Sequence, residues 1–142
     1  MKRLQVYDEV PPEVAQACLT LTNDGSEMHR AFSKRARGEA VLDPHGLTVS
    51  VLTDGPNVIG WGSCSIWHQM WQVQGMVAQE FRRRGLGTAL ISVLLYDHPE
   101  RAFPLAVFDK RCYQIAQSCG WIDVRLYTLT DGFWIPSKYN RK

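Results

Sequence analysis

Residues 82–88, with the sequence RRRGLGT, constrain the fold of this chain more than any other stretch. They lie between an apolar run ending in Met76 and Val77 and a second apolar run, residues 89–96, that is typical of a helix. A strand, a glycine-rich turn and a helix start are therefore predicted in succession. The first N–H groups of a helix have no internal partner and the helix dipole is positive there, so this turn favours a phosphate ligand. Gly85 and Gly87 let the backbone approach that ligand, and three arginines add charge.

The rest of the chain alternates between short strands and helices, without repeats, linkers or low-complexity segments. Strands are expected at residues 4–7, 47–53, 58–67, 71–77, 103–108, 121–129 and 133–135. Helices are expected to open at Pro11 and to span residues 27–37, 89–96 and 110–119, with a break at residues 43–46. This order predicts an α/β fold over residues 1–142, a single domain with a mixed central sheet of about seven strands and about four helices.

Local signals predict how the strands are connected. The strands between residues 47 and 77 follow one another directly and should form an antiparallel meander, whereas the strand–helix–strand succession after it should give a right-handed crossover and a parallel pair. The turn Thr130-Asp131-Gly132 indicates a hairpin. Gly60 and Gly62, inside a strand, indicate a bulge or a close approach of another backbone.

The composition sets the class of protein. A chain of 142 residues with 45% hydrophobic and 21% charged residues is ordinary for one globular domain, and a net charge of +2 gives no general attraction to nucleic acid or membrane. Basic residues do cluster at residues 34–37, but such a run is typical of a solvated helix face, and no aromatic stacking motif accompanies it. A nucleic-acid partner is therefore not expected.

The four cysteines, Cys18, Cys64, Cys112 and Cys119, form no Cys-x-x-Cys pair, so no metal site is predicted. Scattered thiols fit a reducing compartment. The N-terminus has no apolar run typical of a signal peptide, and no stretch is long and apolar enough to span a bilayer. A cytoplasmic location is therefore expected.

The layout resembles the GNAT superfamily of acyl-CoA-dependent N-acyltransferases. The signature of that family, Gln/Arg-x-x-Gly-x-Gly/Ala after the fourth strand, is similar to residues 82–87. Further similarities are the pair Gln79-Glu80 with the aromatic Phe81 before the turn, the strand at residues 58–62, and the helix ending Cys119-Gly120-Trp121. A dinucleotide fingerprint would need a third glycine near Leu90, and a P-loop would need Gly-Lys-Ser/Thr; neither is present.

The resemblance implies that acetyl-CoA is the co-substrate. Its pyrophosphate would be bound by the turn residues Arg82, Arg83, Arg84, Gly85, Leu86, Gly87 and Thr88. Its pantetheine arm would lie in an opening between the fourth and fifth strands, hydrogen-bonded to the backbone of Met76 and Val77. The N–H region of Val77 would polarise the thioester carbonyl. Asp109 takes a position where the family often has an asparagine facing pantetheine, although a plain helix cap is at least as good an interpretation.

The resemblance also defines what is missing. The family commonly places a tyrosine, which protonates the leaving thiolate, four residues before the helix-ending glycine, and that position is Ala116. Tyr113, one turn earlier, is the candidate substitute, and packing is the equally good alternative. Candidate bases for the amine proton are Glu80, His68, Glu27 and His29. The tryptophans Trp61, Trp67 and Trp71 are expected to gather in one region of the sheet, as core or as the wall of an acceptor pocket.

Two functions remain open. The first is an N-acetyltransferase that moves an acetyl group from acetyl-CoA to a primary amine of a small molecule or protein by direct attack. The second is a GNAT-fold binding or regulatory protein that binds CoA or a protein partner with little or no catalysis, which the absence of a tyrosine at position 116 favours slightly. The acceptor is not identified, and a homodimer, which is common in the family, is an open expectation.

Overall fold

The computed structural model describes residues 1–40 and 47–140. Within these ranges seven strands form one mixed sheet in sequential order: β1 (Lys2–Tyr7), β2 (Thr48–Asp54), β3 (Asn57–Trp67), β4 (Met70–Val77), β5 (Leu105–Val107), β6 (Val124–Thr130) and β7 (Phe133–Pro136). The α-helices are α1 (Pro12–Cys18), α2 (Glu27–Ala36), α3 (Leu86–Leu95) and α4 (Lys110–Ser118), with short 3₁₀ helices η1 (Gln79–Phe81) and η2 (Lys138–Asn140). The predicted α/β fold with a mixed sheet is confirmed. The break predicted at residues 43–46 lies outside the described residues.

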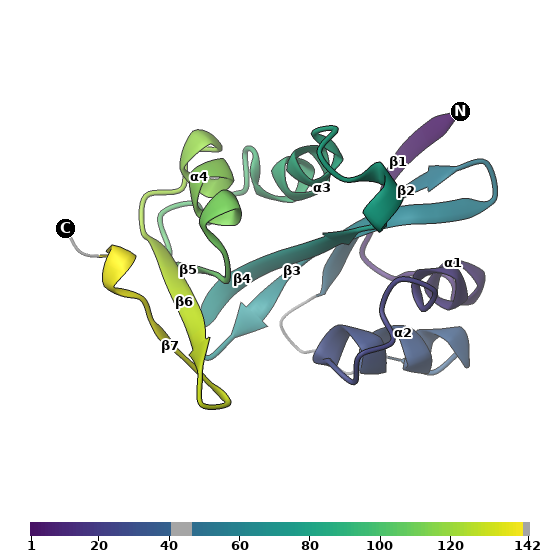
Figure 1. Ribbon diagram of the computed structural model, residues 1–142, viewed down its shortest axis with the longest axis horizontal. Coiled ribbons are helices and arrows are strands. Elements are labelled where there is room, and N and C mark those ends of the chain that lie inside the picture. Colours follow the sequence, from purple (N-terminus) through teal and green to yellow (C-terminus); the bar gives the residue numbers. More distant parts are fainter. Residues whose placement is uncertain (41–46, 141–142) are drawn as a thin grey trace.

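The helices cover opposite faces of the sheet in pairs, α3 and α4 on one face and α1 and α2 on the other (Figure 1). On the first face the core includes Leu95, Leu105 and Val107, none of which is exposed to solvent. On the second face the ring of Phe32 in α2 packs edge-on against Trp61 in β3, with 5.4 Å between ring centroids. The apolar residues of β5 are buried from both sides, which is typical of an interior parallel strand.

The glycines in β3 let α3 lie directly on the sheet. A Cβ atom added at Gly62 would lie 3.0 Å from the carbonyl oxygen of Leu90 in α3, and the Ser50 hydroxyl donates a hydrogen bond of 2.8 Å to that same oxygen. Beside Gly60 the β2–β3 register shifts between Leu52 and Thr53. Both predicted roles of these glycines, a bulge and a close backbone approach, are therefore present.

The sheet has an opening between β4 and β5. β2 to β4 form the predicted antiparallel meander, β1 pairs antiparallel with β2, and β5 lies parallel to both β4 and β6. The β4–β5 pairing covers only Trp71 with Leu105 and Gln72 with Ala106. Residues 73–77 of β4 continue past this point while β5 ends at Val107, so the two strands separate and leave an opening in the sheet.

Two strands are shorter than predicted. The apolar run at residues 103–108 gives only a three-residue strand, Leu105–Val107. The run beginning at Trp121 starts pairing at Val124, because Trp121 still belongs to the end of α4: its backbone N–H donates to the carbonyl of Ala116 at 3.1 Å, past Gly120 with φ of 90°. The backbone N–H of Trp121 therefore closes the helix and is not available for the strand pairing that was predicted from residue 121 onward.

The tryptophans do not share one region of the sheet. Trp61 and Trp67 lie on the same side of β3, and Trp61 packs with α1 and α2. Trp71 packs against the core under α3 and α4, and its indole N–H donates to Glu100 at 2.7 Å. The predicted grouping was wrong because Trp71 is opposite Ile66, whose side chain points to the other face from that of Trp67.

Candidate functional site

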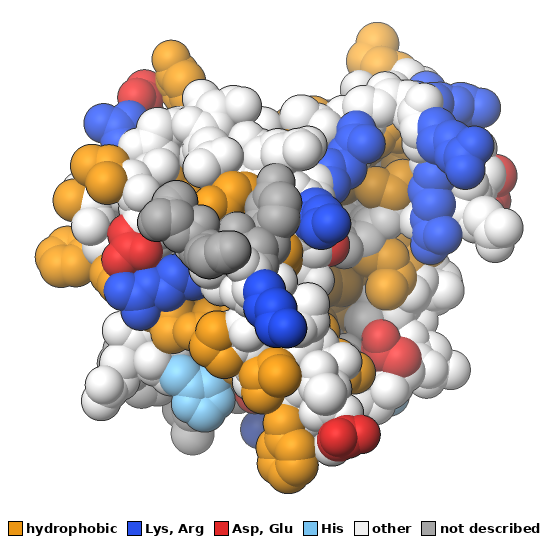
Figure 2. All heavy atoms as spheres, turned by 60° about the vertical axis from the view of Figure 1, so that its left-hand side comes forward, with side chains coloured by type: hydrophobic (Ala, Val, Ile, Leu, Met, Phe, Trp, Pro, Cys, Tyr) orange, Lys and Arg blue, Asp and Glu red, His pale blue; other side chains and the backbone are white. Residues whose placement is uncertain are grey.

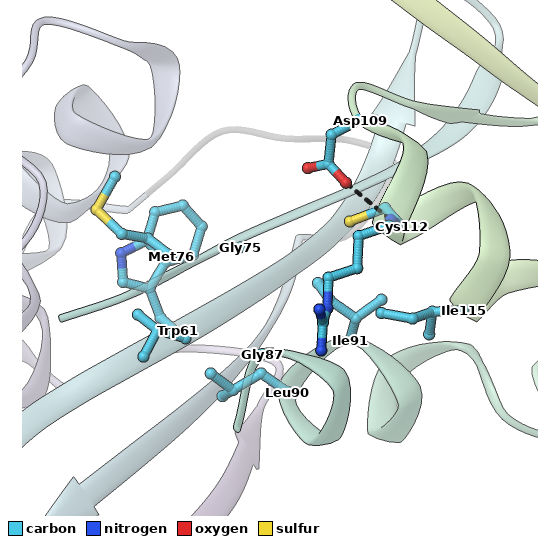
Figure 3. A pocket seen from close by; sticks show the side chains of 11 residues that line it. Trp61, Gly75, Met76, Gly87, Leu90, Ile91, Asp109, Cys112 and Ile115 are labelled. Atoms are coloured by element: carbon cyan, nitrogen blue, oxygen red, sulfur yellow. Dashed lines mark hydrogen bonds between the residues drawn. The ribbon is translucent and has the colours of Figure 1, made fainter. Parts of the chain in front are cut away.

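A cavity of about 330 Å³ lies in the opening between β4 and β5 (Figure 3). Its walls come from β3, β4, α3 and α4, so the sheet and both helices of one face contribute to it. The lining residues are Trp61, Gly75, Met76, Val77, Gly87, Leu90, Ile91, Asp109, Arg111, Cys112 and Ile115. Most of these side chains are apolar, and the polar groups are concentrated where α3 and α4 begin.

The β4 strand presents unpaired backbone groups to this cavity. The N–H of Ala78 donates to Ile59 in β3 at 2.8 Å, and the N–H of Trp71 donates in the opposite direction, to Pro104, at 3.0 Å. Along a strand, successive residues direct their backbone N–H and C=O groups to alternate sides. The polar backbone groups of Met76 therefore point toward β3, and those of Gly75 and Val77 point toward the opening. Gly75 was not among the residues selected from the sequence.

The turn at residues 82–88 forms the expected helix start. Arg83 and Gly85 have φ of 66° and 75°, and Gly85 is the N-cap residue of α3. The first helical bond runs from the Ala89 N–H to the Gly85 carbonyl, and Gly85 has no side chain to cap the earlier N–H groups. No acidic residue lies in the first turn of α3. The N–H groups of Leu86, Gly87 and Thr88 are therefore available to an anion.

Two of the three arginine side chains of the turn have partners within the protein. Arg82 donates through Nε to the Val77 carbonyl at 2.9 Å, and the Arg84 guanidinium lies 5.4 Å from the centre of the Phe81 ring. The carbonyl of Val77 is thus already bonded, which leaves its N–H as the free group. All three arginines are exposed.

The start of α4 forms the opposite wall. Asp109 accepts a hydrogen bond of 2.8 Å from the Cys112 N–H, so it is the N-cap of α4 and also lines the cavity. Arg111 donates to the Thr88 hydroxyl at 3.3 Å, which connects the starts of α3 and α4. Sequence reasoning missed Arg111, since nothing in its local pattern indicates that α4 begins beside α3.

The candidate proton donors lie apart from the cavity lining. Tyr113 is half-buried against the core under α4 and does not line the cavity, and Ala116 is fully buried. Cys112 does line it, but burial raises the pKa of its thiol to about 12, so the thiolate is not available at neutral pH. The role of Tyr113 stays a prediction.

A second cavity, of about 380 Å³, lies on the other face of the sheet, beside the start of α2. It is lined by Ser26, Glu27, Met28, Ser65, Ile66, Trp67, Gln72, Gln74, Phe108 and Trp134. Among the candidate bases, Glu27 is the one that lines it. His29 accepts a hydrogen bond from the Gly25 N–H at 3.1 Å, and His68 and Glu80 are exposed.

Charge is distributed unevenly over the surface. On the face in Figure 2, Lys and Arg side chains gather on both sides of a hollow with hydrophobic side chains in it. Across residues 1–40 and 47–140, no group of three or more His, Cys, Asp or Glu side chains is arranged to hold a metal ion. A search of the same residues for a helix long and apolar enough to cross a bilayer found none. All four cysteines are buried and free.

This site agrees with the class of protein that sequence comparison identifies. The sequence model of the acetyltransferase (GNAT) family matches residues 13–115, which include the turn, α3, both walls of the opening and most of α4. The chain therefore belongs to the GNAT acetyltransferase family, and acetyl transfer is the chemistry of that family. Among curated proteins, no match was found.

Solved structures with a similar fold include several acetyltransferases. The ribosomal-protein-alanine N-acetyltransferase of Brucella melitensis biovar Abortus 2308 is 14% identical, with a TM-score of 0.46 over 90% of this chain and 80% of that one. The glucosamine-6-phosphate N-acetyltransferase of Arabidopsis thaliana is 13% identical, with a TM-score of 0.46 over 87% and 81%. The PaiA N-acetyltransferase of Thermoplasma acidophilum, in complex with coenzyme A, is 10% identical, with a TM-score of 0.42 over 92% and 82%.

Proposed function

We propose that the chain is an N-acetyltransferase that transfers the acetyl group of acetyl-CoA to a primary amine. The observation that carries this proposal is the cavity between β4 and β5, where the inward-facing N–H groups of Gly75 and Val77 lie beside the uncapped start of α3. An elongated amide ligand with a phosphate end matches that arrangement. Family membership is the independent support.

In this proposal the pyrophosphate is held by the N–H groups of Leu86, Gly87 and Thr88, with the helix dipole adding to the attraction. Arg111 and the exposed arginines at 82–84 supply positive charge at the entrance. The pantetheine arm runs along β4 and takes the place that a neighbouring strand would occupy, bonding Gly75 and Val77. Met76 contributes its side chain to the wall, because its backbone groups point toward β3.

The chemical step is a direct attack of the amine on the thioester. Of the two inward-facing N–H groups of β4, one bonds the pantetheine arm and the other would stabilise the negative charge that develops on the thioester oxygen, with Val77 as the sequence-based candidate for that role. The acceptor nitrogen forms a bond to the carbonyl carbon, the carbon–sulfur bond breaks, and CoA leaves as a thiolate that takes up a proton. The acceptor first loses its ammonium proton to water. Tyr113 is the sequence-based candidate for protonating the thiolate.

A second function is favoured by one specific observation. No tyrosine lines the described cavity, which fits a protein that binds CoA but turns it over slowly or not at all. The two functions differ in one measurable quantity, the release of free CoA thiol in the presence of an amine.

The test combines binding with turnover. The purified chain is examined by mass spectrometry for co-purified CoA, titrated with acetyl-CoA by calorimetry, and assayed for thiol release with a panel of primary amines. Binding with amine-dependent thiol release supports the acetyltransferase. Binding without release at any amine supports the second function, and absence of CoA binding at millimolar concentration overturns both.

A further inference from the structure

The second cavity has a wall of aromatic side chains that is already assembled. The ring of Trp67 lies 5.2 Å from that of Phe108, edge-on, and the ring of Phe108 lies 4.7 Å from that of Trp134. Tyr127 supports Trp67 from outside the cavity, again edge-on at 5.2 Å. The three lining rings come from β3, from the residue that follows β5 and from β7, and their mutual contacts fix the shape of the wall without a ligand.

The floor of this cavity is polar but carries no charge. The Gln72 amide donates to the Ser65 hydroxyl at 2.8 Å, and the Gln74 amide donates to the Gln72 oxygen at 3.3 Å. Gln72 is 4% exposed, so the chain of bonds holds it in a fixed orientation. Beside them on β3, opposite Gln74, the buried Ser63 hydroxyl has no partner among the described residues. This floor offers hydrogen bonds to an uncharged or cationic polar group.

Among the described residues that line the cavity, Glu27 is the one charged side chain, and none of them is Lys or Arg. The start of α2 also borders the cavity, and a free helix start would attract anions. The start of α2 is capped, however, because the Ser26 hydroxyl accepts a hydrogen bond from the His29 N–H at 3.2 Å. The carboxylate of Glu27 in the first turn also places a negative charge there. The local field therefore favours a cation and disfavours an anion.

We propose that this cavity binds the acetyl acceptor, and that the acceptor is an arylalkylamine, a cationic amine on a flat aromatic body without an anionic group. The aromatic wall stacks with the ring of the ligand, and Glu27 attracts its ammonium group from the rim. An acceptor with a carboxylate or phosphate would meet Glu27, and no Lys or Arg among the described lining residues would compensate. This inference rests on the proposed function, because it names the substrate class of the same reaction.

The reaction consumes one amine and one thioester. The arylalkylammonium ion loses a proton to water, its nitrogen forms a bond to the acetyl carbon, and the carbon–sulfur bond breaks to release the CoA thiolate. The nitrogen gives up a second proton to the solvent, and the thiolate takes up one proton. The products are an uncharged N-acetyl arylalkylamine and CoA thiol. Because the product has lost its positive charge, its attraction to Glu27 is lost and release is favoured.

The decisive experiment compares ligands that differ by one group. Tyramine and tyrosine share a phenol ring and an amine, and only tyrosine has a carboxylate; spermidine is cationic without a ring; glucosamine 6-phosphate carries an anion. Each is titrated by calorimetry into the full chain with CoA present, and each is assayed for thiol release with acetyl-CoA. We expect tyramine to bind at least about tenfold more tightly than tyrosine, because like charges are strongly disfavoured at such a site. Equal or tighter binding of tyrosine or glucosamine 6-phosphate overturns the inference, and tighter binding of spermidine overturns the aromatic part of it.

Variants of the rim carboxylate complete the test. Glu27→Gln is expected to weaken tyramine binding about three- to fivefold, as removal of an exposed ion pair does, and to reduce the difference in affinity between tyramine and tyrosine. Glu13→Gln is the matched control, because Glu13 lies in the first turn of α1 as Glu27 does in α2, and it is expected to change neither affinity. An unchanged tyramine-to-tyrosine ratio in Glu27→Gln contradicts the inference. If no amine gives thiol release, the proposed function fails, while calorimetry with tyramine still decides the identity of the cavity.

Discussion

The two cavities on either side of β4 are built from different parts of the polypeptide. The first has walls of mostly apolar side chains, and it offers hydrogen bonds largely through backbone: the inward-facing N–H groups of Gly75 and Val77 and the uncapped start of α3. The second is formed by side chains, with an aromatic wall, an amide floor and the carboxylate of Glu27 at its rim. Backbone groups are the same in every protein, so the first cavity suits a constant ligand. Side chains vary freely, so the second suits a ligand particular to this chain.

If this division is correct, the first cavity is most sensitive to changes that obstruct the backbone. Gly87→Asp is expected to weaken CoA binding by at least about 100-fold, because it places a carboxylate and extra volume against the phosphate position. The Gly87→Ala variant is the control: its Cβ would lie 3.7 Å from the Val77 side chain, an ordinary contact, so the fold is retained. Calorimetric titration with CoA measures both, and equal affinities of the two variants would remove the turn from the site.

The second cavity should respond to side-chain truncation with CoA binding unaffected. Trp134→Ala removes the outer ring of the aromatic wall, which is 43% exposed, so the fold is expected to persist. The KM for the amine acceptor is expected to rise about tenfold, as expected for the loss of one stacked aromatic contact. Steady-state kinetics and CoA calorimetry on the same preparation check this. A weakened CoA affinity with an unchanged amine KM would reverse the assignment of the two cavities.

The side chains of the first cavity should matter less than its backbone. Arg111→Ala removes an exposed cation at the entrance and its bond to Thr88. CoA affinity is expected to fall about fivefold, with a dependence on salt that is weaker than that of the unmodified chain. Titrations at low and high ionic strength measure both effects. A loss as large as that of Gly87→Asp would show that arginine side chains, rather than the backbone, hold the phosphates.

The smallest effect is expected for Tyr113 in α4. Tyr113 does not line the cavity, so Tyr113→Phe is expected to change kcat by less than about threefold, far below the 100-fold or more typical of a lost general acid. Thiol release under saturating acetyl-CoA measures it. A loss of about 100-fold would establish Tyr113 as the proton donor and bring its hydroxyl into the reacting complex.

The same division explains how much of the molecule the sequence predicted. The first cavity follows from a contiguous signal, because the glycines at 85 and 87 and the apolar runs around them define a strand, a turn and a helix start within a short stretch. The order of strands and helices followed from similar local patterns. Even there, the sequence did not show which β4 residues direct their backbone groups toward the opening. Only the hydrogen bonds to Ile59 and Pro104 show that Gly75 does so and Met76 does not.

The second cavity has no such signal. Its residues come from the start of α2, from β3 and β4, from the end of β5 and from β7, and no local pattern relates Glu27 to Trp134. Glu27 was one of several candidate bases with nothing to distinguish it. Arg111 was missed for the same reason, because its contact with Thr88 depends on how two helices are placed. Long-range packing, which short patterns do not encode, decides these positions.

The central claim, that the backbone of β4 and of the α3 start holds the cofactor, is tested most directly by following individual backbone amides. We expect CoA to slow the hydrogen exchange of the Gly75 and Val77 amides and to shift the NMR signals of Leu86, Gly87 and Thr88, while the amide of Met76, already directed toward β3, changes little. Perturbations confined to residues of the second cavity, or an equal response of Met76 and Val77, would contradict the account.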